Sequence, residues 1–304
     1  MWSLIVHGGA GPIDDRQSEP HQAGCRRAIE AGARVLEGGG SALDAAQVAV
    51  RVLEDDEVFN AGVGGAVDET GLVMTDAAIF RGDDLGYGAC GAVAGVRNPI
   101  DLARAILEDG KHCLLVGPGA LEFARRKGLR RVDPRAMEVD PSRARWWYAA
   151  SEAPTGGPAL AGAPGEPEVG DTVGAVALDV RGSIAAATST GGLLGKYAGR
   201  VGDSPIAGAG TYARNDWGGI CATGHGETIL KTVLGFQALQ DLRLRAAEAP
   251  ATVLFEALEQ ARARAGGRGG LIAILPTGQA AWARNTPHMG VAWLRRGGAV
   301  ESMF

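Results

Sequence analysis

The sequence predicts a fold that mixes α-helices and β-strands. Short apolar runs bounded by glycine-rich turns predict strands, apolar residues three or four positions apart predict helices, and both patterns occur in each half of the chain. Of the 304 residues, 21% are charged and 46% hydrophobic, which is typical of a soluble globular protein with a substantial core. The 48 glycines are about twice the usual share of roughly 7%, so many tight turns are expected.

The first half begins with a predicted strand at 4–6 that leads into a glycine-rich loop. Such a loop can present backbone N–H groups to an anion or simply turn the chain, and the turn is the favoured interpretation. Two helices are predicted next, at 21–37 and from Ser41, whose hydroxyl is placed to cap the second helix. The half is completed by predicted strands at 72–79 and 88–96 and by predicted helices at 98–109 and 118–126.

The second half opens with a predicted β-hairpin, whose strands at 172–180 and 183–189 flank an Arg-Gly turn. One helix is expected from 224 to about 240, and a second helical stripe follows at 253–261. The other predicted strands lie at 206–212, 217–223, 271–275, 280–284 and 291–294.

Charge and cysteine content argue against several functional classes. The net charge is -5 and there is no long basic run, so no nucleic-acid partner is expected. No apolar run approaches the length of a membrane span, and the first residues lack the basic flank of a signal peptide, so a cytoplasmic protein without a membrane partner is expected. The four cysteines are scattered, which favours buried thiols over disulfides or a zinc site.

The chain changes character just before Thr172. The segment at about 139–170 has five prolines and little apolar periodicity, which predicts a flexible linker with a functional or processing role. A threonine hydroxyl is a weak nucleophile that needs a base. Cleavage between Asp171 and Thr172 would free an α-amine with a pKa of about 7.7–8.0 on the same residue and so supply one. The alternative is that Thr172 simply opens a strand.

Polar residues in later loops suit an amino-acid substrate. Arg200 could hold a carboxylate and Asp203 an ammonium group, although a salt bridge between these two residues is a competing interpretation. Thr223 and Gly224 could offer a hydroxyl and a backbone N–H to a developing oxyanion, or could instead cap the helix that follows them.

Seven short motifs, spread over nearly the whole chain except the linker, resemble those of the plant-type L-asparaginase/isoaspartyl peptidases, a family of N-terminal nucleophile hydrolases. They lie at 7–11, 59–62, 98–104, 171–179, 187–192, 199–205 and 223–227. Two stretches depart from the family pattern. Residues 79–82 read Ile-Phe-Arg-Gly where the family often has Met-Asp-Gly, and 285–290 is only loosely similar, which bears on substrate preference.

The resemblance implies an α+β fold, a four-layer αββα sandwich, in which 1–304 form a single hydrolase domain. It further implies a precursor that cleaves itself into an α chain of 1–171 and a β chain of 172–304, and a homodimer of such αβ units. L-asparagine and β-aspartyl dipeptides are the implied substrates.

For catalysis, the resemblance implies that Thr172 attacks the side-chain amide or isopeptide carbonyl while its amine takes the proton. Water then resolves the β-aspartyl enzyme. Thr190 would support the nucleophile, and Thr223 with Gly224 would form the oxyanion hole. Asn60 would help to shape the site and the precursor.

For binding, the resemblance assigns the substrate α-carboxylate to Arg200, and its α-amine to Asp203 and the backbone of Gly226. No cofactor is implied for catalysis. A structural sodium ion is implied, bound by backbone carbonyls that map to Leu53, Glu54, Asp56, Phe59, Ala61 and Val63. The pattern of the acidic run at 54–57 predicts that its side chains face solvent. The implied sodium site leaves this prediction for the side chains unchanged, because it uses only backbone carbonyls.

Two other functions remain open at the level of sequence. Glycosylasparaginases are related enzymes that share the threonine and the Arg/Asp pair, although the Thr-Gly-His-Gly-Glu stretch at 223–227 weighs against this function. A non-catalytic module that binds a small ligand would stay intact and hydrolyse neither substrate.

Overall fold

The computed structural model describes residues 1–11, 18–137 and 171–304, so the linker predicted at about 139–170 lies outside the described residues. The helices are α1 (Ser18–Glu37), α2 (Ala42–Glu54), α3 (Pro99–Asp109), α4 (Gly117–Arg126), α6 (Gly226–Thr232), α7 (Leu234–Leu244) and α8 (Pro250–Ala265), with a short 3-10 helix at Pro134–Met137. The strands are β1 (Ser3–His7), β2 (Met74–Arg81), β3 (Gly86–Ala94), β4 (Leu114–Val116), β5 (Val173–Leu178), β6 (Ile184–Thr190), β7 (Thr211–Arg214), β8 (Gly218–Gly224), β9 (Gly269–Ile274), β10 (Ala280–Arg284), β11 (Val291–Arg295) and β12 (Glu301–Met303).

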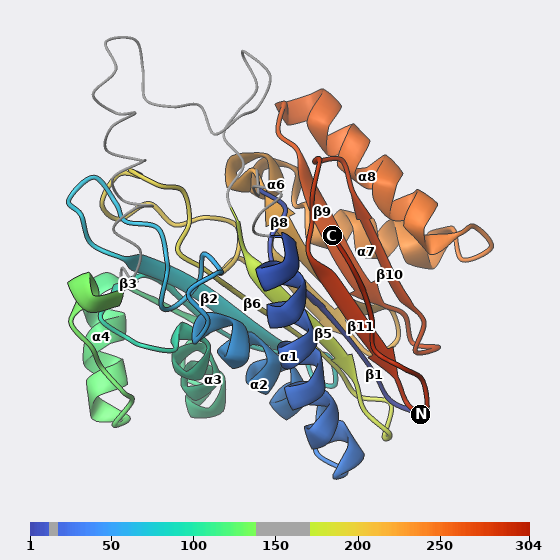
Figure 1. Cartoon of the computed structure of the whole chain (residues 1–304), viewed down its shortest axis with the longest axis horizontal. Coiled ribbons are helices and arrows are strands. Elements are labelled where there is room, and N and C mark those ends of the chain that lie inside the picture. Colours follow the sequence, from blue (N-terminus) through green and yellow to red (C-terminus); the bar gives the residue numbers. More distant parts are fainter. Residues whose placement is uncertain (12–17, 138–170) are drawn as a thin grey trace.

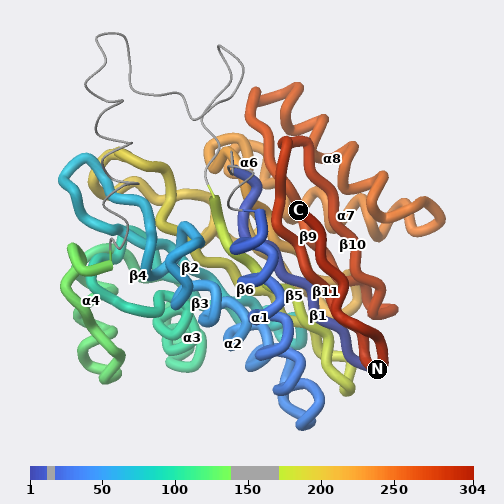
Figure 2. Tube along the Cα trace, viewed as in Figure 1, coloured from blue at the N-terminus to red at the C-terminus, as the bar shows by residue number. Residues whose placement is uncertain are grey.

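The strands form two sheets. The larger has the order β12-β11-β1-β5-β6-β2-β3-β4, and the smaller has the order β10-β9-β8-β7. Neighbouring strands pair antiparallel except β3 and β4, which are parallel and joined through α3. Figure 2 shows β1, from the start of the chain, lying between β11 from its end and β5 from its middle.

Helices cover the outer face of each sheet (Figure 1). On the large sheet, α1 packs against β1 and β11, α2 against β5 and β6, and α3 against β2 and β3. On the small sheet, α7 packs against β8 and α8 against β10. The inner faces of the sheets meet through β5 and β6 on one side and β7 and β8 on the other, over a core that includes Ile5, Val176 and Ile272. The predicted αββα sandwich is confirmed.

Local sequence explains how the first two helices begin and pack. Ser41 has extended backbone angles and its Oγ accepts the N–H of Asp44 (3.1 Å), so the predicted cap of α2 is confirmed. Gly32 lets α1 approach its neighbours, because an added Cβ would lie 2.6 Å from Leu4 Cδ2 and 3.0 Å from the carbonyl oxygen of Ala45. The close packing of α1 against β1 and α2 therefore requires a glycine at position 32.

The prediction of a solvated acidic face at 54–57 is wrong for Glu54. This side chain is fully buried, and its Oε1 accepts the N–H of Ile100 (2.9 Å) in the first turn of α3. Asn98, the residue before that helix, makes no capping bond of its own. Burial raises the pKa of Glu54 to about 8, so its carboxyl group is mostly protonated at neutral pH.

Two element boundaries in the second half differ from the sequence prediction. The strand expected at 206–212 begins only at Thr211, because 203–210 form a tight turn in which Asp203 O accepts the N–H groups of Ile206 (2.9 Å) and Gly210 (3.1 Å). The helix expected to run to 240 breaks at Val233, whose φ of 49° is left-handed, and so forms α6 and α7. Strands β4 and β12 were not predicted, because each has only three residues, too few to show the alternation of apolar and polar side chains that marks a strand.

Cysteine burial follows the prediction with one exception: Cys25, Cys90 and Cys221 are buried free thiols, whereas Cys113 is exposed. Within the described ranges, none of the helices has both the length and the apolar character that crossing a membrane requires.

Candidate active site

Thr172 lies directly before β5 and is only 4% exposed. Because β5 lies between β1 and β6, the strand that follows Thr172 is held from both sides. The backbone N–H of Thr172 donates to Thr223 Oγ1 (3.2 Å), and its own Oγ1 lies 3.2 Å from Ser204 Oγ. The nitrogen and the hydroxyl of Thr172 are thus each held by a side chain from the second half of the molecule.

The carbonyl oxygen of Asp171 accepts hydrogen bonds from Thr190 Oγ1 (2.7 Å) and Asn60 Nδ2 (3.2 Å). Asn60 is itself fixed, because it also donates to Gly192 O (2.8 Å) and accepts the N–H of Ala66 (2.8 Å). Two donors therefore meet at the oxygen of the peptide bond between Asp171 and Thr172. Such an arrangement can stabilise negative charge on that oxygen.

The glycine-rich loop after β1 holds the side chain of Asp171. The N–H of Gly11 donates to Asp171 Oδ1 (2.5 Å). An added Cβ would lie 2.4 Å from this oxygen at Gly9, whose φ is +110°, and 2.6 Å from it at Gly11. The favoured interpretation of this loop as a simple turn is therefore incomplete. The loop also presents a backbone N–H to a carboxylate next to the peptide bond, which was the alternative interpretation.

Arg200 and Asp203 lie in one loop, beside Gly226 at the start of α6. A Cβ added to Gly226 would lie 2.6 Å from Arg200 Nη2 and 3.0 Å from Asp203 Oδ1, so these three residues meet. Arg200 donates through Nε and Nη2 to the carboxylate of Glu227 at 3.0–3.1 Å. The alternative of a salt bridge between Arg200 and Asp203 is therefore wrong.

Asp203 is the buried carboxyl group of this cluster. It is 4% exposed, and its Oδ2 has no hydrogen-bond partner among the described residues. Burial raises the pKa of Asp203 to about 7, although the nearby charge of Arg200 acts in the opposite direction. A buried carboxylate with a free oxygen is a suitable partner for a ligand ammonium group.

One small pocket brings together most of the predicted catalytic and substrate-binding residues, and Asn60 and Thr223 adjoin it through hydrogen bonds to Asp171 and Thr172. It is lined by Asp171, Thr172, Thr190, Gly192, Leu193, Arg200, Asp203, Gly224 and Gly226. Its free volume is about 10 Å³, which is room for no more than a water molecule. A larger hollow of about 310 Å³ lies along α8 and contains none of these residues. We place the chemistry in the small pocket, because there Thr172, whose nitrogen and hydroxyl are both held by hydrogen bonds, lies beside the side chains of Arg200 and Asp203.

Two buried charged residues, which the sequence analysis missed, support the loops of the pocket. Lys196 Nζ donates to the carbonyl oxygens of Met74 (2.5 Å) and Gly191. Asp76 Oδ2 accepts the N–H of Gly202 (2.8 Å). Burial lowers the pKa of Lys196 to about 8, with the charge of Asp76 opposing this shift. A signal existed in the sequence, since Asp76 interrupts an apolar strand.

Ser204 and Glu227 were also missed, although both lie inside motifs used in the sequence analysis, at 199–205 and 223–227. Ser204 contacts the hydroxyl of Thr172, and Glu227 holds Arg200. The motifs indicated the correct stretches, but spacing alone does not give a side chain its partner.

The predicted cation loop follows α2. Three of its six carbonyls accept backbone N–H groups: Leu53 O from Asp56 (3.4 Å), Glu54 O from Val63 (2.9 Å) and Asp56 O from Phe59 (3.1 Å). The other three belong to the buried residues Phe59, Ala61 and Val63, and they accept no hydrogen bond from the described part of the chain. Buried carbonyls without donors fit a cation. No cluster of His, Cys, Asp or Glu side chains that could hold a metal occurs in those same ranges.

Comparison with known proteins gives one consistent result. A family model described as asparaginase matches residues 1–303. The isoaspartyl peptidase/L-asparaginase of Xenopus laevis is 40% identical over 276 residues, which cover 90% of this chain and 86% of that protein. The proteins of the same name from Homo sapiens and Danio rerio are 41% and 37% identical over 292 residues, which cover 95% of this chain and 91% and 90% of those proteins.

Proposed function

Because the chain belongs to the asparaginase family, we propose that it is a threonine hydrolase that cleaves L-asparagine and the β-aspartyl bond of isoaspartyl dipeptides. Relatives named isoaspartyl peptidase/L-asparaginase support this substrate class. The observation that carries the proposal is the placement of Thr172. Its nitrogen and hydroxyl are both fixed by hydrogen bonds, in a pocket that also holds Arg200 and Asp203.

We propose that the chain first cleaves itself into an α chain of 1–171 and a β chain of 172–304. Thr172 Oγ1 attacks the carbonyl carbon of Asp171, and the new C–O bond replaces the peptide C–N bond. The hydroxyl proton ends on the nitrogen of Thr172, which becomes a free α-amine. Thr190 Oγ1 and Asn60 Nδ2 stabilise the charge on the carbonyl oxygen. Water then hydrolyses the ester, which frees the carboxyl end at Asp171 and restores the hydroxyl.

Cleavage also makes room for the substrate. In the uncut chain Asp171 lines the pocket, and the free volume of about 10 Å³ is far below that of an amino acid. Withdrawal of the new carboxyl end from the loop at Gly11 opens the space next to Thr172. Processing therefore supplies both the base and the binding site.

In turnover, the α-amine of Thr172 takes the hydroxyl proton while Oγ1 attacks the side-chain carbonyl of the substrate. Thr223 Oγ1 and the N–H of Gly224 receive the developing oxyanion, and Thr190 supports the nucleophile. The amine passes its proton to the leaving ammonia or peptide amine. Water then attacks the β-aspartyl ester with the same amine as base.

The amino-acid head group is held by charge. The guanidinium group of Arg200 uses Nε and Nη2 for Glu227, which leaves Nη1 for the substrate α-carboxylate. The free oxygen of Asp203 and the backbone of Gly226 receive the α-ammonium group. A ligand that lacks either charge would leave a buried group unpaired, which provides selectivity.

We also propose that the cation loop holds a structural sodium ion through the carbonyls of Leu53, Glu54, Asp56, Phe59, Ala61 and Val63. The three buried carbonyls without donors support this assignment. The ion would fix the loop that carries Asn60 and takes no part in the reaction. A homodimer of αβ units is proposed on the family resemblance.

Intact mass and activity of the purified protein test these proposals together. We expect two fragments that meet at Asp171/Thr172, hydrolysis of a β-aspartyl dipeptide and of L-asparagine, and loss of both properties in Thr172→Ala. Glycosylated asparagine serves as the competing substrate.

A protein that stays in one piece and hydrolyses none of the three would support the ligand-binding module instead. Preference for the glycosylated substrate would indicate a glycosylasparaginase. Full activity of the Thr172→Ala variant would exclude Thr172 as the nucleophile.

A further inference from the structure

Ser204 lies against the reacting hydroxyl, although neither self-cleavage nor turnover, as proposed above, gives it a role. It is fully buried, and its Oγ is 3.2 Å from Thr172 Oγ1. Thirty-two positions of sequence separate the two residues, so their contact depends on the fold.

The backbone around Ser204 is held in place at three consecutive carbonyls. Thr188 Oγ1 donates to Ser204 O (2.9 Å), and Tyr87 Oη donates to Pro205 O. The carbonyl of Asp203 accepts two backbone N–H groups in the tight turn at 203–210. Donors from β6 and β3 therefore fix this turn before any ligand is present, which is what a preorganised contact requires.

The chemistry of Thr172 decides which hydroxyl is the donor. In turnover the proton of Thr172 Oγ1 goes to the α-amine of the same residue, so Oγ1 has no proton left to give to Ser204. The hydrogen bond between the two hydroxyls must then run from Ser204 Oγ to Thr172 Oγ1. A donor in that position stabilises an oxygen on which negative charge develops.

We propose that Ser204 donates a hydrogen bond to Thr172 Oγ1 and so stabilises it as it becomes a nucleophile and, later, a leaving group. Ser204 keeps its own proton throughout, and no bond to it forms or breaks. The proposal rests on Thr172 as the nucleophile. It also gives the neighbours Asp203 and Ser204 separate tasks, since one binds the substrate and the other the attacking oxygen.

The test compares Ser204→Ala with Ser204→Cys. Alanine removes both the hydroxyl and its volume, whereas cysteine restores the volume with a thiol that is a poor donor. We expect both variants to cleave themselves about 10- to 100-fold more slowly than the wild type, as followed by intact mass. We expect kcat for L-asparagine, measured on the fully cut fraction, to fall by a similar factor, with KM changed less than about twofold.

Ser3→Ala is the matched control, because Ser3 is 1% exposed and its Oγ has no hydrogen-bond partner among the described residues. Its cleavage rate and kcat should remain within about twofold of the wild type. Wild-type cleavage and kcat in Ser204→Cys would overturn the proposal in favour of packing, as would a change confined to KM. Activity in Thr172→Ala would instead overturn the role of the nucleophile, so the two failures are distinguishable.

Discussion

At the scale of single residues, Asp203 is expected to lower the stability of the folded chain while providing the proposed contact for the substrate ammonium group. Asp203 is buried with one oxygen unpaired, and its charged form is therefore disfavoured in the folded chain. The folded-state pKa of this carboxyl group is raised to about 7 from an ordinary value near 4. The loss of folding stability that comes from ionising the buried group is therefore absent near pH 4. It grows as pH rises toward 7 and is then constant. A substrate ammonium group would relieve it.

Replacing Asp203 by asparagine should therefore stabilise the protein while weakening binding. At pH 8 we expect the free energy of unfolding to rise by at most about 4 kcal/mol, with little change near pH 4, and KM for L-asparagine to increase at least tenfold. Thermal unfolding between pH 4 and pH 8 measures the first effect. Asp216→Asn is the control, since Asp216 is exposed and paired with Arg214. A variant less stable than the wild type at pH 8 would contradict the argument.

Arg200 depends on the planar shape of its side chain. Two of its nitrogens, Nε and Nη2, hold Glu227, and the proposed contact with the substrate falls to Nη1. Lysine keeps the charge but cannot serve both partners in this geometry. In Arg200→Lys we expect KM for L-asparagine to rise about 10- to 100-fold, measured by steady-state kinetics. Arg214→Lys, at an exposed ion pair, should leave KM unchanged. An unchanged KM in Arg200→Lys would remove Arg200 from substrate binding.

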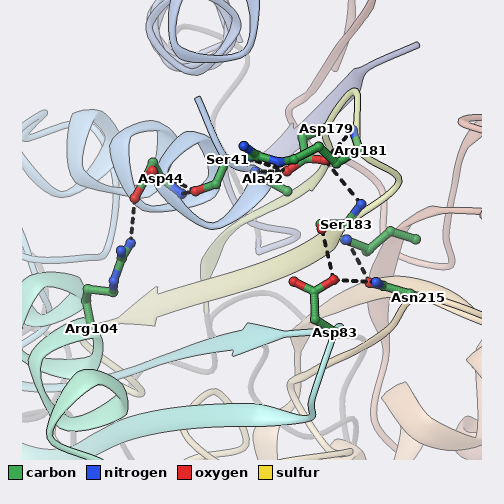
Figure 3. A network of polar contacts seen from close by, with 10 residues as sticks. Ser41, Ala42, Asp44, Asp83, Arg104, Asp179, Arg181, Ser183 and Asn215 are labelled. Carbon is green, nitrogen blue, oxygen red and sulfur yellow. Dashed lines mark hydrogen bonds and ion pairs between the residues drawn. The ribbon is translucent and has the colours of Figure 1, made fainter. Parts of the chain in front are cut away.

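Between elements, a buried carboxylate joins the β5–β6 hairpin to α2 (Figure 3). Asp179 is 1% exposed, and it accepts the N–H groups of Ala42 (3.1 Å), Arg181 (2.8 Å) and Ser183 (3.2 Å). Ser41 caps the same helix from within its own segment. The start of α2 is thus fixed by one local side chain and one from 137 residues away, at the opposite end of β5 from Thr172.

Asp179→Ala should destabilise the fold because it leaves three buried or partly buried N–H groups without this acceptor. We expect a loss of about 2–3 kcal/mol in the free energy of urea unfolding. Asp84→Ala removes an exposed partner of Arg81 and should cost about 1 kcal/mol or less. Equal losses in the free energy of unfolding for the two substitutions would show that the hydrogen bonds to Asp179 stabilise the fold no more than an exposed ion pair does.

In the whole molecule, the proposed cut divides the large sheet into interleaved pieces. In the order β12-β11-β1-β5-β6-β2-β3-β4, three neighbouring pairs join a strand from before Thr172 to a strand from after it: β11–β1, β1–β5 and β6–β2. β1 has β11 and β5 as neighbours, and β6 pairs with β2, so each fragment completes the sheet of the other. Neither fragment has a full core alone.

Cleavage should therefore leave the two fragments bound to each other. We expect them to elute as one particle in size-exclusion chromatography in native buffer and to separate only in denaturant. Thr172→Ala should give the same native elution from a single uncut chain. Fragments that part in native buffer would contradict the interleaved arrangement.

The sequence by itself determined most element positions and the stretches whose residues meet around the small pocket. Periodicity is a local property, so it located β1, α1, α2 and the β5–β6 hairpin, and the motifs located Thr172, Thr190, Arg200, Asp203 and Thr223. Where local signals were short or broken, at β4, β12 and the turn at 203–210, the prediction failed.

Only the tertiary structure decided which side chains meet. Ser204 against Thr172, Gly11 against Asp171 and Asp179 against Ala42 join residues 32, 160 and 137 positions apart. No spacing in the chain encodes such pairs, because strand order and sheet stacking bring them together. Burial is likewise decided by the tertiary structure. The sequence shows that Asp203 and Glu54 carry carboxyl groups, but only the fold excludes water from them and so raises their pKa values.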